Sequence, residues 1–423
     1  MKRALLVLCV LLSLSATAQR RRAVLPPHVS DATPAGWLTN HAYRIATTEI
    51  GGPSNDLQPL KTMIGNAGVV GLGDGTHGTH EFQTVKLRMI DFLVREMGFT
   101  ALAMEAPFPD WTRLNDYVLG GDGDPRQILH NRSLGYYFWS DEEIAAVVDW
   151  MRAYNASRGD KPPVQIAGMD GTDLEGARTL VTQYLDRVDP AEAAKARNAY
   201  LICPPMPGGV ATCDALTEAI RADVAGREGQ YVGSSSQREF NYALHGVTLI
   251  AADFVKHGRS TGLFSDRDLA MADFAQFIRT RQSTGKLILW AHQEHLSKTN
   301  RQIQQGSSTG QYLAERIGAD LYVIGNASAE GTFSAPASST NPELRVYSLT
   351  PLTDDHYETF FRSAAIPNLL IPMRGVSLPD WLLAPHKFHS GAGAGPFEYT
   401  EELSKKFDAV MYIEHTTPVH SFW

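Results

Sequence analysis

The chain has 423 residues, of which 43% are hydrophobic, and a formal net charge of -8. This length and content are typical of a large globular protein with an ample core. The mildly acidic charge and the dispersed basic residues argue against a nucleic-acid-binding protein, and no repeat period is present. No uninterrupted apolar stretch of transmembrane length follows the N-terminal region, so we expect no membrane anchor and, by default, a monomer.

The first 18 residues have the pattern of a secretory signal peptide. Lys2 and Arg3 precede an apolar run over 4–14, and the small residues 16–18 form a cleavage site. The run is too short to span a bilayer. We therefore expect an exported protein, periplasmic or secreted, with a leader over 19–33 and one domain over 34–423.

A glycine-rich turn at 71–81 reads Gly-Leu-Gly-Asp-Gly-Thr-His-Gly-Thr-His-Glu. The valine-rich run before it predicts a strand, and apolar residues at helical spacing after it predict a helix. Its four glycines predict a sharp turn with positive φ. A purely structural turn needs the glycines but not the titratable side chains, so Asp74, His77, His80 and Glu81 indicate a catalytic site at a strand end.

The remaining patterns predict an α/β fold with a mostly parallel central sheet flanked by helices. Between 168 and 286 no strand pattern is present, and the sequence predicts an inserted all-helical lobe over about 174–283 that covers the active-site edge. Helices are predicted within this lobe at 174–188, 191–201, 213–227, 236–257 and 267–281. Strands are predicted at 67–72, 100–104, 164–168, 286–291, 321–325, 344–349, 369–373 and 409–413, and helices outside the lobe at 91–97, 141–154 and 310–317.

Two further strand ends carry polar residues. Glu105 ends an apolar strand, where a carboxylate is either a site residue or a helix cap. His292 and His295 follow another buried strand; a lone histidine is more often structural, but a pair three residues apart favours function. The topology would gather these residues with Asp74 and His77 on one edge.

For several other residues the sequence leaves two roles open. The aromatic run at 136–139, including Tyr137 and Trp139, either lines an apolar substrate's pocket or packs in the core. Arg267 either binds an acidic group or pairs with a neighbouring aspartate. His80 either approaches the same site or faces solvent.

The cysteines also bear on the compartment. Cys9 leaves with the signal peptide, and Cys203 and Cys213 flank a short loop rich in proline and glycine. In an oxidising compartment they are expected to form a disulfide; the alternative is two buried thiols.

Two chemistries fit the predicted cluster. In one, His77 is the general base for a water molecule, a carboxylate fixes its tautomer, and other histidines stabilise the oxyanion. In the other, histidines and carboxylates hold a divalent metal that activates the water. Spacing does not decide between these two chemistries, because no His-Glu-x-x-His or other tight ligand motif is present. The absence of a Gly-x-Ser-x-Gly motif argues against a serine hydrolase.

Several ordered motifs resemble the erythromycin esterase family through most of the chain after the signal peptide. They are Gly71 to Gly78, Glu81-Phe82, Met104 to Ala106, Trp150 to Asn155 and Trp290 to His295, with support from Tyr137 to Trp139, Gly168 to Asp170, Arg267 to Ala272, Gly325 to Phe333, Phe407 to Val410 and Thr417-Pro418.

The resemblance implies a hydrolase that opens a macrolide lactone by water attack, with no metal or other cofactor. It implies His77 as the general base, Glu105 in the active site, and His292 and His295 at the reacting carbonyl. Lys86 matches a basic position of the first helix. Asp74 stands where the family usually has glutamate, and a carboxylate one methylene shorter shifts against its partner. We therefore expect the family and its hydrolytic chemistry, while the substrate is either a macrolide or another ester or lactone. A binding protein that has kept the cleft but lost the chemistry is a further alternative.

Overall fold

The computed structural model describes residues 30–130, 137–203, 211–252, 265–299, 306–338, 341–391 and 395–422. The expected signal peptide and most of the expected leader lie outside these residues. The strands are β1 (Tyr43–Arg44), β2 (Val69–Asp74), β3 (Ala101–Pro107), β4 (Gln165–Asp170), β5 (Leu287–His292), β6 (Leu321–Ser338), β7 (Asn341–Ser348), β8 (Asn368–Pro372), β9 (His386–Ser390), β10 (Phe397–Glu401) and β11 (Ala409–Thr416).

One mixed, mostly parallel sheet organises the described part of the chain. Its strands run in the order β1-β8-β11-β6-β2-β5-β3-β4, with β7 paired to β6, while β9 and β10 form a separate hairpin. The strands from β11 to β4 in this order pair in parallel, and β1, β7 and β8 pair antiparallel. Asp74 at the end of β2 lies opposite His292 at the end of β5.

Helices cover both faces of this sheet. Alternate residues of the central strands enter two separate apolar cores; Leu102 and Ala103, for example, are buried in different ones. The helices are α1 (Pro34–His41), α2 (Pro59–Ile64), α3 (His80–Met97), α4 (Phe108–Val118), α5 (Pro125–Leu129), α6 (Glu142–Ser157), α7 (Leu174–Val188), α8 (Pro190–Ile202), α9 (Ala211–Gly226), α10 (Glu228–Gly233), α11 (Gln237–Ala251), α13 (Ser265–Thr280), α14 (Gln293–Leu296), α15 (Thr309–Ile317), α16 (Tyr357–Arg362), α17 (Asp380–Leu383) and α18 (Leu403–Lys406), with short 3₁₀ turns at Asn55–Leu57, Tyr137–Trp139 and Gly318–Asp320.

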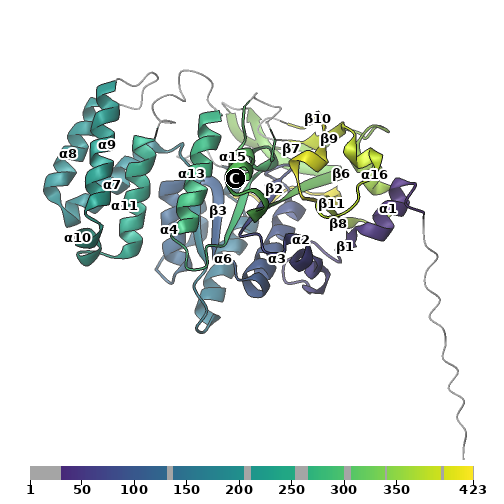
Figure 1. Cartoon of the computed structure of the whole chain (residues 1–423), viewed down its shortest axis with the longest axis horizontal. Coiled ribbons are helices and arrows are strands. Elements are labelled where there is room, and N and C mark those ends of the chain that lie inside the picture. The colour runs from purple at the N-terminus through teal and green to yellow at the C-terminus, as the bar shows by residue number, and fades with distance from the viewer. Residues whose placement is uncertain are drawn as a thin grey trace, which may run out of the picture.

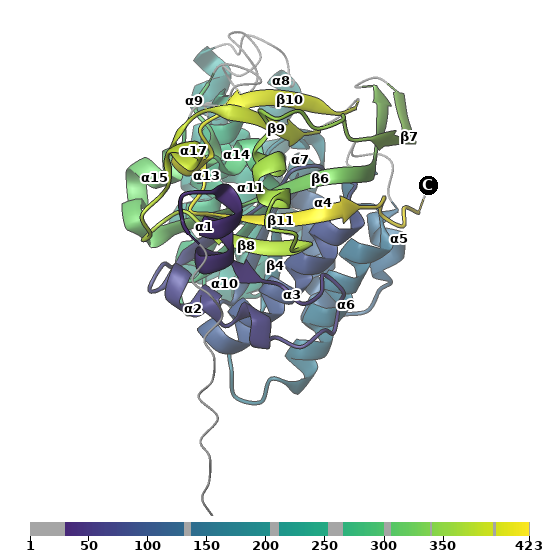
Figure 2. The same ribbon diagram turned by 90° about the vertical axis from the view of Figure 1, so that its right-hand side faces the viewer.

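Figure 1 shows the helical cluster α7–α11 at one end of the molecule, beyond α4 and α13, with α1 and α16 at the other end. Figure 2 turns this second end toward the viewer, with α1, β8 and β11 in front. In the described ranges, no helix is both long enough and apolar enough to cross a membrane.

The predicted α/β class and mostly parallel sheet are confirmed, and each predicted strand overlaps an observed one. The helix predicted over 174–188 coincides with α7, whereas the one predicted over 236–257 ends at Ala251 in α11, and 253–264 lie outside the described residues. The short strands β1, β9 and β10 were not predicted. β1 is two residues long, and neither β9 nor β10 contains an aliphatic side chain, so no apolar run marks any of the three.

The prediction of positive φ in the glycine-rich turn is wrong. None of its four glycines is among those with positive φ. Glycine is needed there for close approach instead, because a Cβ on Gly78 would lie 1.9 Å from the carbonyl oxygen of Ser334, and one on Gly73 would lie 2.8 Å from Cβ of Gln293. The turn is therefore held by packing and by an antiparallel bridge from Gly78 to Ser334.

The expected disulfide is present. Cys203 and Cys213 are bonded, with their Cα atoms 5.4 Å apart, and the bond links the end of α8 to the start of α9. It lies in the helical cluster, away from the strand ends.

Candidate active site

The carboxyl ends of four adjacent parallel strands carry polar residues that are almost fully buried. Asp74 ends β2, His292 ends β5, Glu105 lies near the end of β3 and Asp170 ends β4. Each of the four is no more than 6% exposed. Because parallel strands present these ends at one edge, the sheet itself brings the four side chains together. We call these residues, with His77, Arg267, Asp268 and His295, the strand-end cluster.

Asp74 is held by three groups. Its Oδ1 accepts a hydrogen bond from Nζ of Lys86, on α3, and its Oδ2 accepts one of 2.7 Å from the indole of Trp290. The same Oδ2 lies 3.5 Å from Nδ1 of His77. This arrangement turns Nδ1 of His77 toward an acidic oxygen, so the proton of the neutral ring is favoured on Nδ1 and the lone pair on Nε2.

His77 lies in an apolar environment. Its ring centroid is 4.8 Å from that of Phe138, 5.1 Å from that of Trp139 and 5.2 Å from that of His292. Burial lowers the pKa of His77 from 6.5 to about 4; Glu105 opposes this change, while His295 and Arg267 add to it. His77 is therefore neutral at neutral pH, as a general base must be.

Glu105 links three parts of the cluster. Its Oε1 accepts a 2.8 Å bond from Arg267 and lies 3.1 Å from Nε2 of His295, while its Oε2 accepts a 2.8 Å bond from the backbone N–H of His292. Burial opposes ionisation of this carboxyl, but His295, Arg267 and His77 outweigh it and hold its pKa well below the usual range. Glu105 is thus a carboxylate.

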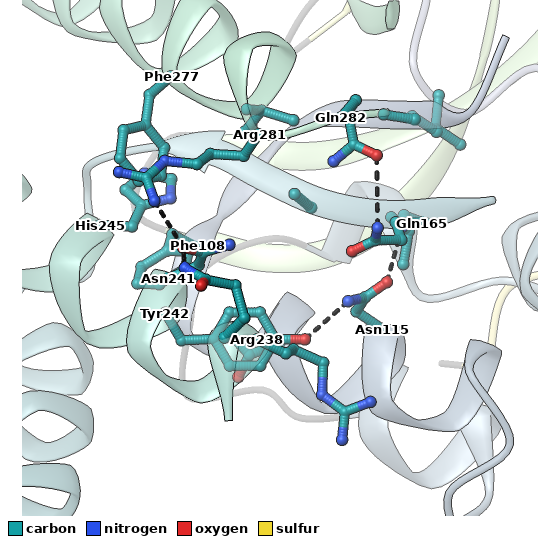
Figure 3. A pocket seen from close by; sticks show the side chains of 17 residues that line it. Phe108, Asn115, Gln165, Arg238, Asn241, Tyr242, His245, Phe277, Arg281 and Gln282 are labelled. Atoms are coloured by element: carbon teal, nitrogen blue, oxygen red, sulfur yellow. Dashed lines mark hydrogen bonds between the residues drawn. The ribbon is translucent and has the colours of Figure 1, made fainter. Parts of the chain in front are cut away.

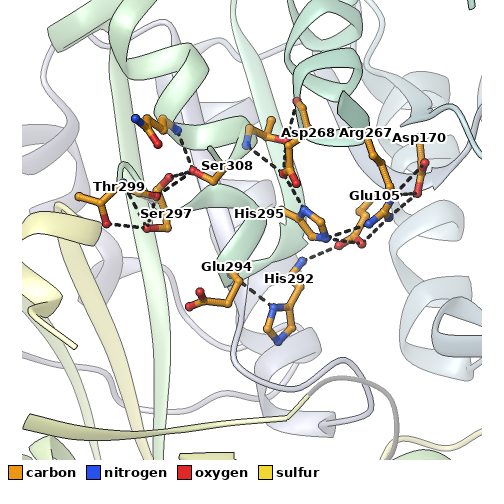
Figure 4. Close-up of polar contacts among 12 residues, drawn as sticks. Glu105, Asp170, Arg267, Asp268, His292, Glu294, His295, Ser297, Thr299 and Ser308 are labelled. Carbon is orange, nitrogen blue, oxygen red and sulfur yellow. Dashed lines mark hydrogen bonds and ion pairs between the residues drawn. The ribbon is translucent and has the colours of Figure 1, made fainter. Parts of the chain in front are cut away.

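Arg267 and His295 lie side by side and are fixed by carboxylates (Figure 4). Arg267 donates to Asp170 through Nη2 at 2.5 Å, and its Nη1 lies 3.0 Å from Nε2 of His295. Nδ1 of His295 contacts Asp268 at 2.7 Å. Burial lowers the pKa of His295, but Asp268 and Glu105 raise it to a net value above its usual one.

Both nitrogens of His295 and both oxygens of Glu105 contact protein groups. The cluster is therefore preorganised by the chain's own residues. In the described ranges, groups of three histidine or acidic side chains with converging ligand atoms occur at His80, Glu143 and His420 and at His356, His389 and Glu398, and both groups are distinct from the strand-end cluster.

Two aromatic residues, Trp139 and Tyr137, were also predicted to lie at the site. Trp139 is buried, donates from its indole to the backbone oxygen of Glu105, and packs on His77 and Trp290, so it serves both the core and the site. Tyr137 begins a 3₁₀ turn, but its side chain and the whole of Tyr136 lie outside the described residues.

The structure distinguishes between the alternative roles that the sequence left open for Arg267 and His80. Arg267 pairs with the site residues Asp170 and Glu105. His80 contacts Glu143 at 2.6 Å, outside the strand-end cluster.

Two acidic residues of the cluster were missed as site residues from the sequence. Asp170 ends a strand, as Glu105 nearly does, so its position was the available signal. Asp268 follows Arg267 in α13 and accepts bonds from the N–H and Oγ1 of Thr309. No sequence spacing shows that this carboxylate faces His295, because the contact joins segments 27 residues apart.

A separate cavity of about 270 Å³ lies at the opposite, amino ends of β3 and β4 (Figure 3). Ala101 and Gln165 from these strands line it, with Asn115 from α4, His245 from α11 and Arg281 near the end of α13. It shares no lining residue with the strand-end cluster, so it is not the candidate active site.

An α/β sheet with this constellation at its strand ends has the features of a hydrolytic enzyme, and family comparison agrees. The erythromycin esterase family model matches residues 94–416. This match covers most of the chain, which therefore belongs to the erythromycin esterase family.

Individual relatives are distant but match along nearly their whole length. The chain is 22% identical to the putative hydrolase YbfO of Bacillus subtilis, with 90% of this chain and 91% of YbfO covered. It is 23% identical to erythromycin esterase type II of Escherichia coli, with 86% and 93% covered. A crystal structure of a Bacillus cereus protein matches with a TM-score of 0.79 and 26% identity over 92% of this chain and 98% of that one.

Proposed function

We propose that the protein is an exported, metal-independent hydrolase that opens a carboxylic ester or lactone by attack of a water molecule activated by His77. The observation that carries this proposal is the juxtaposition of a neutral buried histidine, with a pKa of about 4, and the guanidinium of Arg267, which lies beside His295 and is held by buried carboxylates.

His77 is suited to the role of general base. Its Nδ1 faces Asp74, which Lys86 and Trp290 hold in place. The opposite nitrogen is then the proton acceptor for water. As that proton arrives, the imidazolium is stabilised by the negative charge of Glu105, and Asp74 lies 3.5 Å from its Nδ1.

The positive charge of Arg267 is suited to stabilise the negative charge that develops on the carbonyl oxygen. This charge is fixed before substrate binds, because Asp170 and Glu105 hold the guanidinium beside His295, so little reorganisation is needed in the transition state. His292 has its ring centroid 5.2 Å from that of His77, and its backbone N–H donates to Glu105, which also contacts Arg267 and His295. We assign it to the carbonyl as well.

For the substrate we propose a macrolide-type lactone, with other esters and lactones of small molecules as the broader class. The support is family membership and similarity to an erythromycin esterase. Asp74 stands where the family usually has glutamate. It accepts hydrogen bonds from Lys86 and Trp290, so the shorter carboxylate is held in place here. Its 3.5 Å separation from His77 leaves a looser contact with the base.

Mass spectrometry tests this function directly. Chelator-treated protein is incubated with a panel of macrolides, simple lactones and linear esters, beside a His77→Ala variant. We expect a gain of one water on a lactone, or cleavage of an ester, that the variant does not produce. If no compound reacts until a metal is added, the metal-independent mechanism is wrong; if ligands raise the Tm but none is ever hydrolysed, the enzyme assignment is wrong.

A further inference from the structure

The last residues of the described chain, 417–422, cross back over the glycine-rich turn; we call them the C-terminal strap. The backbone N–H of His80 donates to the carbonyl oxygen of Thr417 at 2.9 Å, and the N–H of Val419 donates to that of Gly78 at 3.1 Å. The strap therefore lies directly against the segment that carries His77.

The strap also contacts the start of α6. The backbone N–H of Glu142 donates to the carbonyl oxygen of His420 at 3.0 Å, and that of Phe422 donates to the oxygen of Ser140. Three segments distant in sequence, the start of α3, the start of α6 and the strap, thus meet at one place.

Three side chains converge at this meeting point. Nδ1 of His80 and Nδ1 of His420 each lie 2.6 Å from the same Oε1 of Glu143. The potential ligand atoms of the three residues all lie within 4.8 Å of one another. Glu143 is buried, His80 is partly buried and the side chain of His420 is 70% exposed, so the group opens to solvent on one side.

These donors have the chemistry of a zinc site. Two imidazole nitrogens and one carboxylate oxygen are ligands that Zn²⁺ prefers, and the fourth tetrahedral position would face solvent beside His420. When both Nδ1 atoms bind an ion, each ring keeps its proton on Nε2. Nε2 of His80 then faces the carboxylate of Glu49, whose Oε1 lies 3.8 Å away.

The other histidine group in the described residues fits an ion less well. There the backbone N–H of Thr353 donates to Nδ1 of His356 at 2.9 Å. That bond leaves the ring proton of neutral His356 on Nε2, the nitrogen that faces Glu398. His356 would have to lose this bond to offer a lone pair, whereas His80 and His420 need only exchange a proton for the metal.

We propose that His80, Glu143 and His420 form a divalent transition-metal site, selective for Zn²⁺ over Mg²⁺ and Ca²⁺, that fastens the C-terminal strap to the turn carrying His77. The nitrogen ligands account for this selectivity, because Mg²⁺ and Ca²⁺ require oxygen ligands. The ion is structural and lies apart from the strand-end cluster.

Zinc titration of the chelator-stripped full chain tests the proposal, by calorimetry and by Tm. The test variants are His80→Asn and His420→Ala; the latter removes a mostly exposed side chain and should fold normally. His415→Ala, which removes another exposed histidine of the C-terminal region, is the matched control, and His292→Ala and His356→Gln report on the other histidine groups.

We expect one Zn²⁺ per chain and a higher Tm with Zn²⁺ in the wild type and in the three control variants. Affinity should fall at least tenfold in His80→Asn and in His420→Ala, and neither Mg²⁺ nor Ca²⁺ should compete. Absence of saturable zinc binding would overturn the proposal. Zinc binding that is undiminished in His420→Ala would also overturn it. If zinc binding is lost only in His292→Ala or only in His356→Gln, the ion binds at that histidine instead and the proposal is wrong.

Discussion

The depressed pKa of His77 predicts a specific loss of stability in acid that replacement of this residue should remove. In the folded protein this pKa is about 4, whereas in the unfolded chain it is near its usual 6.5. As the pH falls below 6.5, the unfolded chain takes up the proton first, which lowers its free energy relative to that of the folded protein. The contribution of His77 to stability is therefore complete above pH 6.5 and is lost as the pH falls through 4.

The magnitude follows from these two pKa values. Between pH 7 and pH 5 the free energy of unfolding should fall by about 2 kcal/mol because of His77 alone. Urea unfolding of the wild type and of His77→Asn gives the free energy of unfolding of each protein at pH 7 and at pH 5. The contribution of His77 is the difference between the two proteins in how far this free energy falls. Buried groups that do not interact with His77, such as His245 with its pKa of about 3, contribute equally to both proteins and cancel. Identical pH dependences would refute the buried, neutral state of His77.

Three other perturbations test the structure around the site. Glu105→Gln should lower the free energy of unfolding by about 1 to 3 kcal/mol in urea denaturation, because buried Arg267 loses one of its two carboxylate partners; an unchanged free energy of unfolding would contradict this buried ion pair. Reducing the bond between Cys203 and Cys213 should cost about 2 to 3 kcal/mol and lower the Tm, and the double serine variant should show no response to reductant. Gly310→Ala places a Cβ 2.0 Å from the carbonyl oxygen of Leu296, so we expect a loss of about 1 to 3 kcal/mol and weaker activity through displaced α14; an unchanged Tm would contradict this close contact.

The pattern of apolar runs predicted the sheet well because central parallel strands are buried on both faces. The runs before His292 and around Leu102 are uninterrupted, and both form strands at the predicted places. The residues at the strand ends were also predictable, since parallel strands gather them at one edge. Edge strands such as β9 have no such run and were missed.

The partners within the site were less predictable. Arg267 was expected either to bind an acidic group or to pair with an aspartate nearby in sequence, and the structure pairs it with Asp170, 97 residues away. His80 was expected in the cluster or in solvent, and it contacts Glu143 instead. These pairings depend on how distant helices are placed against the sheet, and periodicity in a single sequence contains no information on that placement.

Turnover by His77→Ala tests the central claim most directly. On any ester or lactone that the wild type opens, the variant should lose at least about 10² to 10⁴ in kcat, the range attributed to general base catalysis, while its circular dichroism is unchanged. Added imidazole should restore part of the rate by entering the vacated space. Turnover by the variant at the wild-type rate would show that another group activates the water.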